Sequence, residues 1–285
     1  MMRGRLLFTG DIHGDPIERF SFKRHPELLT LKHEDVMVVL GDGGLPFGVE
    51  AKWYDPARDR YNIRWLAEKP WQTVIIAGNH DDRCAISKMP IVDAFGGQMR
   101  QMMFDGIVYP NIFYVDCPGV YSINGRNCLI IPGAESRDIW NLLDPDNPDF
   151  EVQQRMLNKN RQWYRIKNWT WWEDEAINVD LCKIVRKDQE WDNQHFDYIL
   201  THDSPALFCE LFASGHGYRE APTEGELYLD ELRQNLDFDV WFHGHQHMNK
   251  AYPAPEIKTE TIFYKEIYYP GDDRIMCLYE WIIED

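Results

Sequence analysis

The sequence predicts a layered α/β fold, because short apolar runs recur along it with helical patterns between several of them. Continuous aliphatic runs of four or five residues are typical of strands that are buried on both faces of a sheet. Strands that alternate with helices indicate sheets covered by layers of helices. The expected strands are 5–9, 36–40, 73–77, 128–132, 198–201 and 240–242.

Two helices are expected at 56–69 and 223–235. In the second, Thr223 and Glu226 have the spacing of a capping box, in which each side chain accepts a hydrogen bond from the other residue's backbone amide. Residues 107–132 are expected to form consecutive short strands, with Asn124–Gly125 as the tight turn of a hairpin. A further hairpin is expected towards the C-terminus, from 262 to 283.

A segment at about 135–194 is rich in Trp, Asp and Asn and has no clear strand pattern. We therefore expect it to be an insertion or cap. The sequence contains no internal repeat and no low-complexity tract. The simplest organisation is a single domain over residues 1–285 that carries this insertion at 135–194.

The net charge of −17 disfavours sequence-independent binding to extended duplex nucleic acid or to an anionic membrane. An anionic substrate must then be attracted locally, and two divalent cations would reverse the field of a carboxylate-rich pocket. No stretch resembles a signal peptide or approaches the roughly 18 apolar residues of a membrane span. The six cysteines have no paired spacing, so we expect a reduced, cytoplasmic protein.

Residue types that bind metals follow five of the expected strands. The carboxyl ends of strands form the ligand crevice in open α/β sheets. Mixed shells of carboxylate, amide and imidazole groups suit Mn²⁺, Fe²⁺ and Zn²⁺, so the sequence predicts a two-metal centre. The five clusters are Asp11-Ile12-His13, Gly41-Asp42, Gly78-Asn79-His80-Asp81, His202-Asp203 and His243-Gly244-His245-Gln246-His247.

In composition and order, these clusters resemble the five motifs of the calcineurin-like metallophosphoesterase superfamily: D-x-H, G-D, G-N-H-D/E, a lone H after a strand, and G-H-x-H. The resemblance extends from residue 11 to residue 247. It implies a β-sandwich core flanked by helices, in four layers α/β/β/α. It also implies a hydrolase in which a hydroxide shared by two metal ions attacks a phosphate ester.

The resemblance further implies a role for each matching residue. His80 would contact the phosphate and protonate the leaving oxygen, with Asp81 orienting its other ring nitrogen. The preferred identity of both divalent ions would be Mn²⁺, with Fe²⁺, Zn²⁺ or Ni²⁺ as alternatives. The implied ligands are Asp11, His13 and His247 for the first metal, Asn79, His202 and His245 for the second, and Asp42 as the bridge.

The motifs of this sequence differ from those of two known branches of the superfamily, so the activities of those branches are not expected. Protein serine/threonine phosphatases carry G-D-x-x-D-R-G, whereas Gly41–Phe47 lacks both the second Asp and the Arg. Purple acid phosphatases lack a histidine where this chain has His13 and use a tyrosine ligand where it has Leu45. The runs 133–138 (GAESRD) and 171–175 (WWEDE) are instead similar to small bacterial and phage metallophosphoesterases whose substrates are unassigned.

The insertion is the expected source of substrate specificity. Residues 155–168 contain five basic residues and no acid, interleaved with aromatic side chains that could stack on a base. The alternative is a solvated helix face whose aromatic residues pack on the core. The candidate substrate contacts are Arg137, Arg161 and Arg165.

We therefore expect a phosphodiesterase or phosphomonoesterase that acts on a nucleotide or another small phosphate ester. A nuclease acting on short or single-stranded nucleic acid is the alternative. A metal-binding scaffold without catalysis is disfavoured, because no motif residue is missing. No membrane partner is expected, and the oligomeric state is left open.

Overall fold

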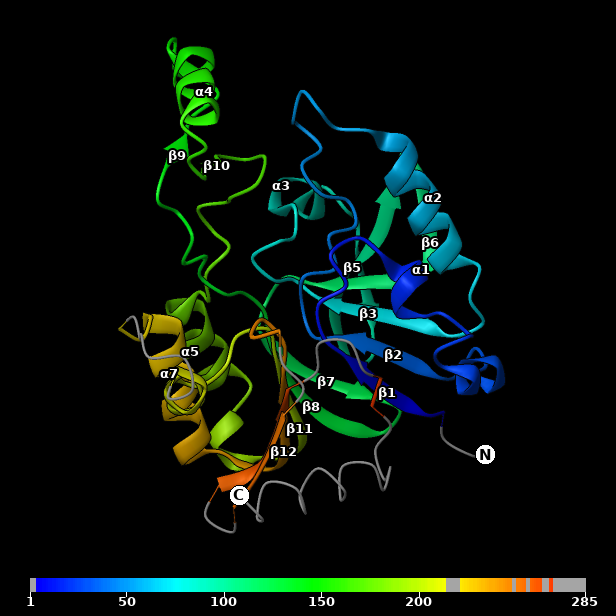
Figure 1. The fold of residues 1–285 in the computed structure, drawn as a ribbon. Helices are drawn as coiled ribbons and strands as arrows, with labels where there is room; N and C mark the ends of the chain where they lie inside the picture. Colours follow the sequence, from blue (N-terminus) through cyan, green and yellow to red (C-terminus); the bar gives the residue numbers. More distant parts are fainter. Residues whose placement is uncertain (1–3, 214–220, 248–249, 255–256, 263–266, 269–285) are drawn as a thin grey trace.

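The computed structural model describes residues 4–213, 221–247, 250–254, 257–262 and 267–268. In these residues two six-stranded mixed sheets pack against each other, and helices cover the outer face of each sheet (Figure 1). The chain therefore has a mixed α/β fold with the layer order α/β/β/α, which confirms the expected fold class. No helix in the described residues is long and apolar enough to cross a membrane.

The first sheet has the strand order β1-β2-β3-β6-β5-β4, in which β1, β2, β3 and β6 are parallel and β5 and β4 are antiparallel. Its strands are β1 (Leu6–Thr9), β2 (Val36–Val39), β3 (Gln72–Ile76), β4 (Ile91–Ala94), β5 (Gly97–Phe104) and β6 (Ile107–Val115).

The second sheet has the order β13-β14-β12-β11-β8-β7, with β14, β12, β11 and β8 parallel and the two edge strands antiparallel. Its strands are β7 (Gly119–Ile123), β8 (Arg126–Ile131), β11 (His195–Thr201), β12 (Asp237–His243), β13 (Lys250–Ala254) and β14 (Ile257–Ile262).

The central strands contain unbroken apolar runs, such as Val36–Val39 of β2, because both of their faces are buried there. In β1, Phe8 faces the second sheet and stacks on Phe242 with ring centroids 4.5 Å apart. The neighbouring Leu7 faces the opposite way, into the core beneath the helices on the first sheet. This alternation explains why the strand pattern in the sequence is continuous rather than period two.

The helices that form the outer layers begin at recognisable capping residues. Asp55 caps α2 (Pro56–Ala67), and Asn178 caps α5 (Val179–Asp188). The capping box of Thr223 and Glu226 begins α7 (Glu224–Asn235) and confirms that prediction. The remaining helices are α1 (Pro16–Arg19), η1 (Pro26–Thr30), α3 (Arg83–Ser87), η2 (Trp191–Asn193) and α6 (Ala206–Ala213).

The two hairpins expected from the sequence, at Asn124–Gly125 and at 262–283, differ in how far the structure describes them. The turn at Asn124–Gly125 joins β7 to β8 with positive φ at both residues, as expected of this hairpin. Strands β4 and β5 were not expected from the sequence. The expected hairpin at 262–283 lies outside the described residues, apart from Ile262, Ile267 and Tyr268.

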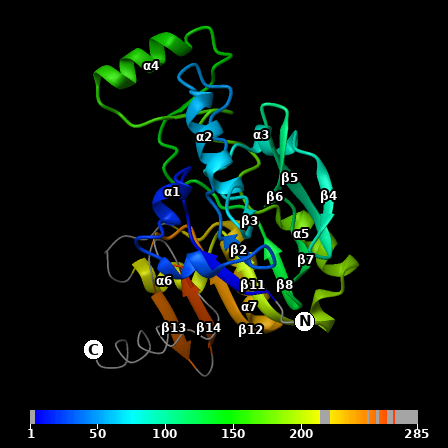
Figure 2. The ribbon, with the colours of Figure 1, turned by 90° about the vertical axis from the view of Figure 1, so that its right-hand side faces the viewer.

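The expected insertion at 135–194 divides into two structural parts. Residues 139–171, here called the arm, contain β9 (Leu142–Leu143), α4 (Phe150–Lys159) and β10 (Arg165–Ile166). The arm has a small core, which it shares with Ala51 before α2, and it stands above the layers in Figures 1 and 2. Helix α5, by contrast, packs on the second sheet as part of the outer helical layer.

Candidate metal centre

All seven sequence-predicted metal ligands lie in loops at the carboxyl ends of parallel strands. The loops after β1, β2 and β3 come from the first sheet, and those after β11 and β12 come from the second. The centre therefore lies where the ends of the two sheets meet. Six of these side chains form two groups that could each hold a metal ion: Asp11, His13 and His247, and Asp42, His202 and His245. A third such group in the described residues, Asp203, Cys209 and Glu226, contains none of the predicted ligands.

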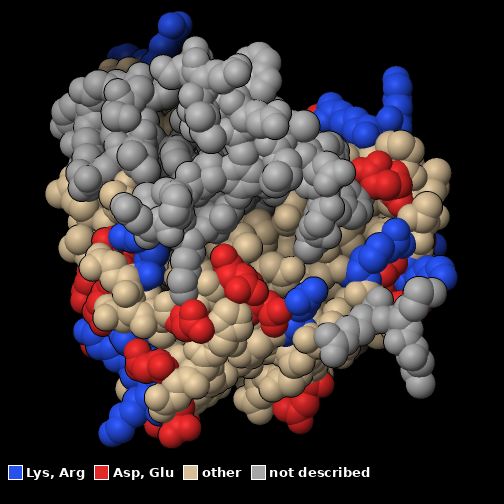
Figure 3. Space-filling model, turned by 90° about the horizontal axis from the view of Figure 1, so that it is seen from below, with Lys and Arg blue, Asp and Glu red and all other residues tan. Residues whose placement is uncertain are grey.

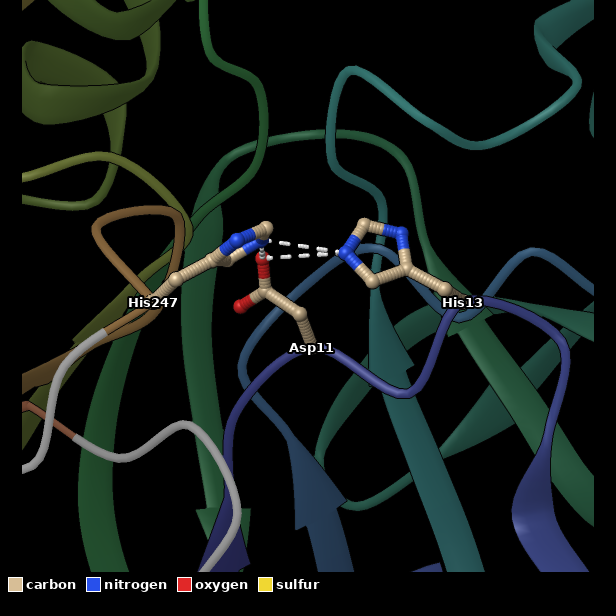
Figure 4. A group of neighbouring side chains, drawn as sticks. All are labelled: Asp11, His13 and His247. Carbon is tan, nitrogen blue, oxygen red and sulfur yellow. Dashed lines mark hydrogen bonds and ion pairs between the residues drawn. The ribbon is translucent and has the colours of Figure 1, made fainter.

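In the first group, the Asp11 carboxylate lies between the imidazoles of His13 and His247 (Figure 4). Asp11 Oδ2 is 3.0 Å from His247 Nε2 and 3.8 Å from His13 Nε2, and the two histidine nitrogens are 3.0 Å apart. Asp11 Oδ2 is buried and makes no hydrogen bond with the part of the chain that the structure describes, whereas Oδ1 accepts one from the backbone amide of His245. A buried carboxylate oxygen beside two imidazole nitrogens is a donor set that fits a divalent cation.

The second group surrounds the fully buried His202. Its Nε2 lies 3.2 Å from Asp42 Oδ1 and 3.1 Å from Asn79 Oδ1. Its Nδ1 lies 2.8 Å from the carbonyl of Leu40 and donates to it, which directs Nε2 towards the site. Asn79 is held in turn by Ser136, whose hydroxyl accepts from the Asn79 side-chain amide at 3.1 Å.

Asp42 lies between the two groups. Its Oδ2 is 4.0 Å from His13 Nδ1 in one group, and its Oδ1 is 3.2 Å from His202 Nε2 in the other. Gly41 makes this approach possible, since a Cβ there would lie 1.8 Å from His202 Nδ1 and the residue has φ of +101°. The position suits a carboxylate shared by two cations.

The electrostatics of the centre reflect its burial and its charges. Burial raises the pKa of Asp42, but neighbouring His202 has the opposite effect and the net pKa is well below normal. Burial lowers the pKa of His202, and Asp42 more than offsets this, raising it to about 10. Burial also lowers the pKa of His245 to about 3, so this imidazole is neutral at neutral pH and suited to binding a metal.

The side chain of His80 lies beside the two groups rather than within them. Its ring centroid is 5.2 Å from that of His13, and its backbone amide donates to Asp42 Oδ1 at 2.7 Å. Burial lowers the pKa of His80, Asp42 raises it, and Arg165 lowers it further. His80 is therefore placed to contact a ligand held at the centre.

The Asp81 carboxylate, expected to orient the His80 ring, makes its hydrogen bonds to other groups in the described residues. The buried Asp81 carboxylate accepts hydrogen bonds from the backbone amides of Gly44 at 2.7 Å and Gly78 at 2.8 Å, and from the Tyr114 hydroxyl at 3.1 Å. Asp81 thus ties the loop after β2 to the loop after β3, because a buried carboxylate needs donors on both oxygens.

The three sequence-predicted arginines have different positions. Arg165, on β10 of the arm, is 7% exposed and places Nη2 3.3 Å from His80 Nε2. Arg137 instead pairs with the buried Glu226 at 2.5 Å, at the start of α7. Arg161 is exposed at the end of α4 and makes no ion pair with the described residues. Only Arg165 is brought to the metal centre by a contact with one of its residues.

Residues that were not predicted as part of the site support Arg165 and Asn79. Asp138 accepts from Arg165 Nη2 at 2.7 Å and from Arg165 Nε at 3.1 Å. Glu175 accepts from the backbone amide of Ser136 at 2.8 Å. Ser136, Asp138 and Glu175 all belong to the GAESRD and WWEDE runs, so these motifs could have pointed to them.

A cavity of about 780 Å³ opens beside His13, the one candidate metal ligand in its lining. It lies along α1 and α2, and its polar wall includes Arg24, Arg58 and Asn62. Arg24 pairs with Glu18, whereas Arg58 has no ion-pair partner among the described residues.

The sequence matches the calcineurin-like phosphoesterase family over residues 4–249. A similar solved structure is the phosphopantetheinyl hydrolase from Mycobacterium tuberculosis, with 13% sequence identity, coverage of 98% of this chain and 94% of that chain, and a TM-score of 0.43. No curated protein sequence matches this chain. Members of the matched family typically bind two divalent metals, in agreement with the two His/Asp groups. The chain belongs to the calcineurin-like phosphoesterase family and is a phosphoric ester hydrolase.

Proposed function

We propose that this chain hydrolyses a phosphodiester or phosphomonoester, either of a nucleotide or of another small phosphate ester. The reaction would use two divalent metal ions, with Mn²⁺ as the preferred metal. The position of Asp42 between the two groups of candidate ligands is the observation that carries this proposal. Asp11, His13 and His247 would hold one ion, and Asn79, His202 and His245 the other. When bound, the ions would activate water and stabilise negative charge on the phosphate.

The residues around the metals would position the ester and its proton. His80 and Arg165 lie 3.3 Å apart, so both can contact the same phosphate group. Arg165 would supply N–H donors in a fixed position, since Asp138 and the Thr170 carbonyl hold its guanidinium in place. His80 would donate a proton to the leaving oxygen.

The structure gives Arg137 and Arg161 weaker support as substrate contacts. Arg137 is engaged by Glu226, whose charge it neutralises at the start of α7. Arg161 lies on the exposed side of the arm. We therefore propose Arg165 as the arginine that meets the substrate.

An extended duplex is not the proposed substrate. The net charge is −17, and Figure 3 shows acidic and basic side chains interspersed over the described part of one face, with no broad basic surface there. The exposed Trp163 favours single-stranded nucleic acid as the second candidate, because bases can stack on such a ring. Cleavage of a short single-stranded oligonucleotide in preference to mononucleotide esters would support it.

The test is hydrolysis of bis-p-nitrophenyl phosphate and p-nitrophenyl phosphate by the purified, Mn²⁺-loaded chain. Asp42→Asn is expected to lower turnover by at least about 10², the scale of losing a metal bridge. Asp188→Asn is the matched control, since Asp188 is an exposed carboxylate at the end of α5. Full turnover in Asp42→Asn would contradict the two-metal assignment.

A further inference from the structure

A second cavity, of about 340 Å³, lies in the arm away from the metal ligands. Its lining has aromatic rings and amide side chains but no charged side chain. The residues that define it, here called the arm pocket, are Trp53, Gln154, Asn158, Gln162, Trp163, Tyr164, Ile166 and Thr170. The pocket is thus formed by α4, the segment that leads into β10, and one tryptophan from the loop before α2.

The aromatic wall of the arm pocket is unusually exposed. Trp53 is 54% exposed and Trp163 is 58% exposed, although an indole ring normally gains from being covered. Two other aromatic residues of the arm, Phe150 and Trp169, are buried in its small core. The two exposed rings are therefore available to stack on a planar ligand.

The amide wall is available for hydrogen bonding. The side chains of Gln154 and Gln162 make no hydrogen bond with any described residue. Asn158 uses its oxygen to accept from the Tyr164 hydroxyl at 3.1 Å, which leaves its NH₂ group available. Amide groups offer both donors and acceptors, and they match the polar edge of a heteroaromatic ring.

The arm pocket is connected to the metal centre through residues that both share. Trp163 lines the pocket, and its Nε1 donates to Asp138, the carboxylate that holds Arg165. The Trp163 ring lies 5.9 Å from the Arg165 guanidinium carbon, and Arg165 lies 3.3 Å from His80. Thr170 lines the pocket too, and its carbonyl accepts from Arg165 at 3.2 Å.

We infer that the arm pocket binds the nucleobase of a nucleotide substrate whose phosphate reaches Arg165 and His80. The inference rests on the proposed phosphoesterase function and deepens it. A stacked, uncharged ring with polar edges satisfies both walls of the pocket, whereas an alkyl chain would leave the amides without partners. Trp163 at the base and Arg165 at the phosphate would then both be held by Asp138.

Binding of nucleosides to the full-length, Mn²⁺-loaded chain tests this inference without any need for catalysis, because a nucleoside has no phosphate to lose. Adenosine, guanosine, cytidine, uridine and ribose are titrated by calorimetry or ligand-observed NMR. At least one nucleoside is expected to bind at least about fivefold more tightly than ribose, as one stacked base would provide. Equal affinity of ribose and all four nucleosides overturns the inference.

Variants locate the binding. Trp53→Ala and Gln154→Ala alter the pocket at residues that make no contact with Arg165 or Asp138 among the described residues, and each is expected to remove most of the preference over ribose. Trp140→Ala is the matched control, since Trp140 is 77% exposed and does not line the pocket. An equal loss in Trp140→Ala also overturns the inference.

Kinetics separate the inference from the proposed function on which it rests. The p-nitrophenyl ester of thymidine 5′-monophosphate and methyl p-nitrophenyl phosphate share a leaving group and differ in the nucleoside. Trp53→Ala is expected to raise KM about fivefold or more for the first ester and to leave the second unchanged. If neither ester is hydrolysed, the proposed function fails, and the nucleoside titrations still decide the inference.

Discussion

Arg165 of the arm lies within hydrogen-bond distance of His80 at the metal centre, with 3.3 Å between Nη2 and Nε2. The two residues are separated by 85 positions in the sequence, and the arm brings them together. An arginine cannot give up its proton at ordinary pH, so His80 Nε2 accepts the hydrogen bond when no ligand is present. A phosphate that contacts both residues would accept the hydrogen bond from Arg165 in place of His80.

Replacing Arg165 tests this relationship. Arg165→Ala is expected to lower kcat/KM for bis-p-nitrophenyl phosphate by about 10- to 100-fold, the scale of one charge-assisted hydrogen bond. Arg161→Ala is the matched control, because Arg161 is an exposed arginine of the same arm. Equal effects of the two replacements in steady-state kinetics would show that the contact with His80 is not used.

Asp81 is expected to act on stability rather than on His80. Asp81→Ala removes the acceptor for the amides of Gly44 and Gly78 and for Tyr114, and such loss of a buried carboxylate should cost about 3 kcal/mol of unfolding free energy. Urea denaturation measures this cost, with Asp188→Ala as the exposed control. Unchanged stability together with reduced turnover would favour the role at His80 that the sequence suggested.

Gly41 is expected to control the approach of His202 to Asp42. Gly41→Ala places a Cβ 1.8 Å from His202 Nδ1, so we expect Mn²⁺ affinity to fall at least about tenfold, as when a residue that orients a ligand is lost. Gly106→Ala is the control, since Gly106 also has positive φ but a Cβ there would meet nothing within 4 Å. Equal losses in metal titrations of the two variants would assign the effect to backbone strain alone.

Glu175 is expected to make stability depend on pH. Burial raises its pKa from 4.5 to about 7, although hydrogen bonds from Ser136 and Trp172 act in the opposite direction. The folded chain therefore binds this proton more tightly than the unfolded chain, and the stabilisation that is complete below pH 4.5 is lost as pH rises through 7. The loss is of the order of 3 kcal/mol.

The replacement Glu175→Gln removes this titration. The unfolding free energy of the variant, measured by urea denaturation, should fall less between pH 4.5 and pH 7.5 than that of the parent chain. Glu173→Gln, at a neighbouring exposed position, should retain the dependence of the parent chain. Parallel profiles for Glu175→Gln and the parent would contradict the assignment.

The strands at the centre of the sheets were predictable because burial on both faces leaves an unbroken apolar run, as in Val36–Val39. The candidate ligands were predictable for a related reason, since polar residues such as Asp42 and His202 stand out where such runs end. Strands β4 and β5 were not identified, because they have no unbroken apolar run: β4 has no buried residue and includes Asp93, and polar residues such as Arg100 separate the buried residues of β5.

The contacts of Asp81 and Arg165 around the metal centre could not be predicted from the sequence in the same way. Asp81 binds backbone amides, which have no signature in a side-chain pattern. Arg165 reaches His80 only through the tertiary placement of the arm, and its partner Asp138 lies 27 positions away in the sequence. The basic stretch that includes Arg165 indicated a phosphate contact, but only the fold separates Arg165 from the exposed Arg161.

The metal content of the chain tests the central claim most directly. Elemental analysis after equilibration with Mn²⁺ and removal of the free ion is expected to give two ions per chain, and chelation is expected to abolish ester hydrolysis until Mn²⁺ is restored. Asp11→Ala should lower the content towards one ion, because the Asp11 carboxylate is a candidate ligand in only one of the two groups and meets the other only through the His245 backbone amide. A content of one ion or none in the unaltered chain, with full hydrolytic activity, would contradict a centre built on two metals around Asp42.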